Sequence, residues 1–246
     1  MDRLPKDSRS ASKPVPPGEA KKRHPVPNLV IFDCDGVLVD SEVIFARILA
    51  ECLTAAHLPA TAEESLVLGV GKNRDSLAAA VEARYGRALP DGFFDAMRAQ
   101  SAIALARELE PMPGVEALLN ALTAARCVAS NGHLGRVRER LALTGLLRFF
   151  DPHVFSATQV ASGKPAPDLF LLAARQLGAH PADCTVVEDS VVGVAAAVAA
   201  GMPVLGFCGG SHCSGGHADQ LVAAGCSQVF AKMADLADYL GDGRCG

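Results

Sequence analysis

Short apolar runs alternate with helical patterns along most of this chain, and this alternation limits the possible folds more than any other feature. The runs expected to be strands are 28–32, 127–130, 153–155, 184–188, 203–207 and 228–230, and the helices expected in this part of the chain are 115–125, 135–144, 168–177 and 192–200. Strands that alternate with helices form a parallel sheet covered on both faces. We therefore predict an α/β fold with a Rossmann-like parallel sheet core.

Residues 43–110 interrupt this alternation, because they carry helical patterns without a strand between them. The helices expected here are 43–57, 62–68, 75–85 and 93–108. A proline-rich segment at 111–114 then breaks the chain, as is common at a domain edge. We predict a small α-helical cap at 43–110, inserted into a core made of 28–42 and 111–246.

The first 27 residues are rich in Pro, Ser, Lys and Arg and contain almost nothing to bury. Such a composition predicts a disordered tail. A transit peptide is the alternative, but the tail has no amphipathic period and contains Asp2, Asp7 and Glu19. A solvated extension is the preferred interpretation.

Composition excludes several classes of function. The formal net charge of −4 gives no reason to expect nucleic-acid binding, and no apolar stretch has the length and texture of a membrane span. Eight cysteines without a preceding secretory segment indicate a reduced, cytoplasmic location. For the oligomeric state, a monomer is the default expectation. Four zinc-ligand residues lie in one glycine-rich segment, although their spacing matches no common zinc finger: Cys208, His212, Cys213 and His217.

Two carboxylates, Asp33 and Asp35, directly follow the first predicted strand and precede Gly36. The carboxyl ends of parallel strands border the ligand crevice of an open α/β sheet. Two adjacent negative charges are costly there without a cation, and Mg²⁺ prefers carboxylates together with phosphate oxygens. A surface Asp-Gly turn is the alternative interpretation.

Three more polar clusters follow in the same way, at or after the ends of predicted strands. They are Ser130-Asn131, the loop lysine Lys164, and Glu188-Asp189. Taken singly, Ser130 or the acidic pair could cap a helix, and Lys164 could be a solvated lysine. Together with the first cluster they supply a nucleophile, an acid, a hydroxyl donor and a cation, which suits phosphoryl transfer.

These motifs together resemble those of the haloacid dehalogenase (HAD) superfamily of phosphohydrolases. The matching segments are 31–42, 130–131, 163–168, 188–190, Gly193 and 199–202, within a similarity that spans about residues 28–232. The chain is most similar to the branch with an inserted helical cap. That branch holds β-phosphoglucomutase, phosphoglycolate phosphatase and phosphatases of sugar phosphates and of 6-phosphogluconate.

The resemblance implies a catalytic role for each motif residue. Asp33 would attack phosphorus and form an aspartyl-phosphate, and Asp35 would protonate the leaving alcohol and then activate water. Ser130 and Asn131 would bind phosphoryl oxygens, the latter through its backbone amide. Lys164 would pair with Asp33 and the phosphate and neutralise charge in the transition state.

The resemblance also implies a Mg²⁺ site. The ligands would be Asp33, Asp189, the backbone carbonyl of Asp35, and Glu188 either directly or through water. True haloacid dehalogenases carry Tyr where Asp35 stands and use no Mg²⁺, so Asp35 favours phosphate-ester chemistry.

The segment that would read the substrate lies in the cap. Segment 69–77 resembles the substrate-specificity loop of β-phosphoglucomutase with one residue added, and its substrate candidates are Gly71, Lys72 and Arg74. A helix-capping turn with solvated cations is the alternative. Phe45 stands where β-phosphoglucomutase has a His, which argues against a mutase. The expected function is a Mg²⁺-dependent phosphatase of a small sugar or sugar-acid phosphate such as 6-phosphogluconate. A sugar phosphomutase and a non-catalytic binding module are the alternatives.

Overall fold

The computed structural model of the protein describes residues 27–69 and 74–241. Across these residues, six strands form one parallel sheet in the order β3-β2-β1-β4-β5-β6. The strands are β1 (Leu29–Phe32), β2 (Ala125–Ser130), β3 (Val154–Ser156), β4 (Cys184–Glu188), β5 (Val204–Phe207) and β6 (Gln228–Phe230). The predicted α/β fold with a parallel sheet is confirmed. The predicted disordered tail lies outside the described residues, apart from residue 27.

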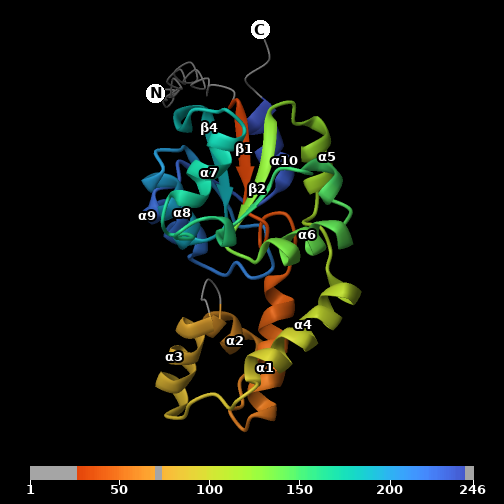
Figure 1. Ribbon diagram of the computed structural model, residues 1–246, viewed down its shortest axis with the longest axis vertical. Helices are drawn as coiled ribbons and strands as arrows, with labels where there is room; N and C mark the ends of the chain where they lie inside the picture. The colour runs from red at the N-terminus through yellow and green to blue at the C-terminus, as the bar shows by residue number, and fades with distance from the viewer. Residues whose placement is uncertain (1–26, 70–73, 242–246) are drawn as a thin grey trace, which may run out of the picture.

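The central strand β1 is buried on both faces because helices cover the sheet from both sides (Figure 1). Val30 and Phe32 belong to one hydrophobic cluster, whereas Leu29 and Ile31 belong to the other. The first cluster is completed by α5 (Val115–Ala121), α6 (Leu134–Leu143) and α10 (Met233–Gly241), and the second by α7 (Asp168–Gln176), α8 (Val191–Ala199) and α9 (His217–Ala224). Continuous apolar runs are typical of such doubly covered parallel strands.

Four successive helices follow β1 and lie together at one end of the sheet (Figure 1). They are α1 (Glu42–Ala55), α2 (Ala62–Gly69), α3 (Arg74–Tyr85) and α4 (Phe93–Glu108). The segments that lead into and out of this helical block lie side by side, since the backbone N–H of Met112 donates to the carbonyl of Leu38 at 2.8 Å. This block agrees with the predicted helical cap. The domain boundaries at 42/43 and 110/111 stay a prediction.

The helix predicted at 115–125 is too long, because α5 ends at Ala121. Leu122 has an extended backbone, and the side chain of Arg126 donates to the carbonyl oxygens of Leu119 and Leu122. A side chain from the next strand therefore satisfies the end of this helix, and β2 begins at Ala125. The helices α9 and α10 were not predicted.

The helices and the cysteines of the described residues can be compared with the expectations from composition. Among the described residues, the helices are all too short or too polar to cross a bilayer. The seven cysteines in the described part of the chain are free, and most of them are buried.

Candidate active site

Lys164 lies at the centre of the polar cluster at the carboxyl ends of β1 and β4. Its Nζ atom donates to Oδ1 of Asp33 at 2.7 Å and to Oε1 of Glu188 at 2.5 Å. The side chain of Lys164 is only 3% exposed, so the alternative of a solvated loop lysine is wrong. One ammonium group thus joins Asp33 and Glu188, which lie more than 150 residues apart in the sequence.

Three carboxylates crowd around this single ammonium group. Oxygen atoms of Asp33, Glu188 and Asp189 all lie within 4.8 Å of one another. Burial raises the pKa of Asp33 well above its usual range, Lys164 lowers it, and the two neighbouring carboxylates raise it again. Burial and Glu188 likewise raise the pKa of Asp189. A buried cluster with surplus negative charge and oxygen donors fits Mg²⁺.

Glu188 is held by donors on both of its oxygen atoms. Oε1 accepts from Lys164, and Oε2 accepts from the backbone N–H groups of Asp189 and Ser190 and from the Ser190 hydroxyl, at 2.9–3.1 Å. A Cβ atom on Gly193 would lie 1.8 Å from Oε1, so this residue must be glycine for Glu188 to fit. Asp33 and Asp189 each keep one carboxylate oxygen that bonds to no other described residue. Direct contact with a cation therefore falls most readily to these two.

Asp35 faces a different set of partners from Asp33. Its Oδ1 atom accepts from the hydroxyl of Ser41 at 2.6 Å, and its Oδ2 atom pairs with the guanidinium of Arg140. Arg140 also lies over the ring of Phe45, 4.8 Å from the ring centre. The Asp35 carboxylate is not one of the three clustered carboxylates, and the role predicted for its backbone carbonyl stays a prediction. Arg140 was missed because a helical arginine 105 residues away carries no local motif.

Ser130 and Asn131 end β2 and begin the loop before α6. The buried hydroxyl of Ser130 accepts from the backbone N–H of Gly132 at 3.0 Å, while His133 caps α6, so the helix-cap alternative for Ser130 is wrong. The amide of Asn131 bonds to the backbone N–H and carbonyl of Lys164 at 2.8 and 3.0 Å. The side chain of Asn131 thus fixes the Lys164 loop, and the binding of phosphate by the backbone N–H of Asn131 stays a prediction.

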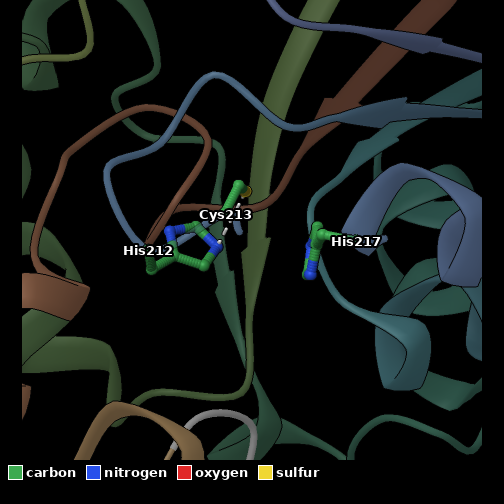
Figure 2. Close-up of side chains that lie close together, drawn as sticks. All are labelled: His212, Cys213 and His217. Carbon is green, nitrogen blue, oxygen red and sulfur yellow. Dashed lines mark hydrogen bonds between the residues drawn. The ribbon is translucent and has the colours of Figure 1, made fainter. Parts of the chain in front are cut away.

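His212, Cys213 and His217 lie together beside Asp189, as Figure 2 shows for the first three. Nε2 of His212 lies 2.9 Å from Oδ2 of Asp189. Nε2 of His217 lies 2.6 Å from the backbone carbonyl oxygen of Asp189. Burial raises the pKa of Cys213 to about 12, which keeps a proton on its sulfur. Cys208, the fourth residue of the possible zinc set, is outside this group. The two imidazoles therefore hold Asp189 in position from both sides.

Gly36 and Glu42 complete the surroundings of the carboxylates. Gly36 is buried and has a φ of +77°, and a Cβ atom on it would lie 2.0 Å from Oδ2 of Asp189. The turn at Asp35-Gly36 therefore packs against the acidic cluster, and the alternative of a surface turn is wrong. Burial raises the pKa of Glu42 and, together with the neighbouring carboxylates of Asp35 and Asp189, brings it to about 8. Glu42 is thus a further carboxyl of the site, and its ionisation depends on the charge of the neighbouring carboxylates.

The predicted substrate residues of the cap are only partly described. Gly71 and Lys72 lie outside the described residues, whereas Arg74 begins α3 and lies over the ring of Phe94, 4.6 Å from its centre. Arg74 borders a cavity of about 480 Å³ between the helical block and α6. Its predicted role in substrate binding stays a prediction.

Comparison with known proteins identifies the family. The model of the haloacid dehalogenase-like hydrolases matches residues 27–201. The chain is 33% identical to 6-phosphogluconate phosphatase of Escherichia coli over 184 residues, which cover 74% of this chain and 83% of the relative. It is 30% identical to phosphorylated carbohydrates phosphatase of Thermotoga maritima over 177 residues, covering 70% and 81%.

A solved structure agrees with these relatives in fold. A haloacid dehalogenase-like protein from Agrobacterium tumefaciens superposes with a TM-score of 0.81 at 39% identity, covering 87% of this chain and 98% of that one. The predicted family and the predicted enzyme class, a phosphoric monoester hydrolase, are confirmed. Its motifs, its fold and these matches show that the chain belongs to the haloacid dehalogenase-like hydrolases.

Proposed function

We propose that this chain is a Mg²⁺-dependent phosphatase of a small sugar or sugar-acid phosphate such as 6-phosphogluconate. The observation that carries the proposal is the buried contact of Lys164 with Asp33 and Glu188, with Asp189 beside them. It supplies a carboxylate nucleophile, a fixed cation and oxygen donors for a metal in one place. Relatives that act on 6-phosphogluconate and on phosphorylated carbohydrates support the substrate class.

Asp33 performs the first step of the proposed reaction. Its carboxylate attacks phosphorus, the bond to the leaving oxygen breaks, and an aspartyl-phosphate forms on Asp33. Lys164 lowers the pKa of the nucleophile and stabilises the phosphoryl oxygens, and the Ser130 hydroxyl donates to them. Bound to Asp33 and Asp189, Mg²⁺ would lower the repulsion between the carboxylate and the anionic phosphate.

Asp35 manages the proton in both half-reactions. It donates a proton to the leaving alcohol and later takes one from the water that attacks the aspartyl-phosphate, which regenerates Asp33. In this structure Asp35 is bound by Ser41 and Arg140. Asp35 must therefore exchange one of these partners for the leaving-group oxygen during turnover.

Release of inorganic phosphate tests the proposal directly. We expect the purified protein to hydrolyse p-nitrophenyl phosphate and 6-phosphogluconate with Mg²⁺ and to lose this activity in EDTA. Metal-independent turnover would contradict the metal assignment. The mutase alternative is tested with β-glucose 1-phosphate and a bisphosphate primer: glucose 6-phosphate accumulating without free phosphate would overturn the phosphatase proposal.

Stabilisation by Mg²⁺ should grow as the pH rises. The raised pKa values of Asp33 and Asp189 mean that the folded protein binds more protons than the unfolded chain above about pH 4, so without metal the free energy of unfolding falls with rising pH. Mg²⁺ must displace those protons and binds more tightly at higher pH. At a Mg²⁺ concentration 100 times the Kd, the gain is about 2.7 kcal/mol. Thermal denaturation at pH 5.5 and 8, with and without Mg²⁺, measures this gain.

Two variants frame the measurement. Asp189→Asn should lose most of the Mg²⁺-induced rise in Tm, because it removes one of the two available ligands. Asp235→Asn changes an exposed carboxyl at the start of α10 and should keep the full rise. If Mg²⁺ raised the Tm of the unmodified protein equally at both pH values, metal binding would not displace protons from these carboxyls, and the prediction would fail.

A further inference from the structure

A cavity of about 480 Å³ lies between the helical block and the core, bounded by α1, α3, α4 and α6. Its lining is cationic, and the cavity is partly open to solvent. Four of its thirteen lining residues are arginines, namely Arg74, Arg98, Arg136 and Arg140, and one is acidic, namely Glu139. The remainder is apolar except for Ser101, and it includes Phe45 and Phe94, whose rings lie under the guanidinium groups of Arg140 and Arg74. Such a space selects a ligand that carries negative charge and a compact carbon skeleton.

Arg140 connects this cavity to the reaction centre. It lines the cavity and, on its other side, pairs with Asp35, the proposed proton donor to the leaving group. The leaving group of a substrate bound at Asp33 must lie against Asp35. The cavity therefore begins at the residue that pairs with Asp35, on the side of Arg140 where none of the described catalytic side chains lies.

The arginines of the cavity have capacity for a ligand. The Nε atom of Arg140 is buried and has no hydrogen-bond partner among the described residues, which is costly unless an acceptor binds there. Arg136 is exposed and makes no ion pair with another described residue, while Arg98 shares only an exposed pair with Asp95. Guanidinium groups recognise carboxylates and phosphates by paired hydrogen bonds.

We propose that this cavity binds a second anionic group on the leaving group of the substrate, and that Arg136 and Arg140 select for it. This inference rests on the proposed phosphatase function and narrows its substrate class. The preferred substrates are then sugar-acid phosphates or bisphosphates rather than neutral sugar phosphates. An anion that engages Arg140 also draws this cation from Asp35, which frees the carboxyl for the leaving oxygen.

Two matched substrate pairs test the proposal. 6-Phosphogluconate and sorbitol 6-phosphate differ only by a carboxylate in place of a CH₂OH group, and fructose 1,6-bisphosphate differs from fructose 1-phosphate by the second phosphate. We expect kcat/KM to favour the more anionic member of at least one pair by about 10- to 100-fold, the effect of one charge-assisted hydrogen bond. The pair that shows the preference identifies the anion.

Variants on α6 provide the controls. Arg136→Gln should reduce the preference by about tenfold or more, measured as the ratio of kcat/KM within the pair. Arg138→Gln lies on the same helix but pairs with Asp151 and does not line the cavity, so it should leave the ratio unchanged. Ratios near one for both pairs, or a ratio that Arg136→Gln does not alter, would overturn the proposal.

Binding to the Asp33→Asn variant separates this inference from the phosphatase function. Calorimetry of the same compounds should show the more anionic member binding more tightly, with the difference lost in Asp33→Asn/Arg136→Gln. If no phosphate ester is hydrolysed, the proposed function fails while this binding ratio still decides the inference. If esters are hydrolysed without a preference for the second anion, the inference alone fails.

Discussion

Replacement of Asp33 by Asn is expected to reduce phosphatase turnover by at least about 10³-fold, because an amide cannot form the acyl-phosphate on which the proposed reaction depends. The fold should remain intact. Asn has the same shape as Asp, and its carbonyl oxygen can still accept from Nζ of Lys164, which lies 2.7 Å from the oxygen that it replaces. The variant also removes the buried carboxyl group of Asp33, whose pKa is raised by burial.

The comparison needs both kinetics and stability. Release of phosphate under single-turnover conditions measures the chemical step, and thermal denaturation without metal should give a Tm equal to or above that of the unmodified protein. Asp235→Asn removes an exposed carboxyl at the start of α10 and should keep full activity. If Asp33→Asn kept more than about a tenth of the activity, Asp33 would not be the nucleophile.

The sheet could be predicted because each strand carries its own signal. Runs such as 184–188 and 228–230 match β4 and β6 at both ends, and the helix predicted at 93–108 matches α4. The error at α5 has a long-range cause, since the helix ends where Arg126 of the next strand meets its last carbonyls. Periodicity within a window contains no information about such a side chain.

The candidate site could be predicted only as far as local motifs reach. Asp33, Lys164 and Glu188 were found because each stands in a short pattern near a strand end, and the structure brings them into contact. Arg140 and the contact of His212 with Asp189 had no comparable signal. His212 was noted only as a zinc-ligand candidate, because its partner Asp189 is close in the fold and distant in the sequence.

Replacement of Lys164 by Met is expected to destabilise the protein by about 3–5 kcal/mol near pH 8 in the absence of metal, the cost of removing one partner of a buried ion pair. Met fills a similar volume, but it leaves Asp33 and Glu188 buried without their shared cation. The loss should also abolish measurable phosphatase activity, because the transition state loses its fixed positive charge.

The pH dependence of this loss distinguishes charge from packing. Without Lys164 the pKa of Asp33 rises further, because the ammonium group is what lowers it. The carboxyl then stays protonated in the folded state, and the cost of folding grows as the pH rises above the unfolded pKa of about 4. The difference in unfolding free energy between the two proteins should therefore be smaller at pH 5 than at pH 8, and Mg²⁺ should offset part of it. Lys232→Met, which changes an exposed lysine, should show neither effect. A loss that is equal at both pH values would mean that Lys164 contributes packing alone, and the charge argument for the candidate site would fail with it.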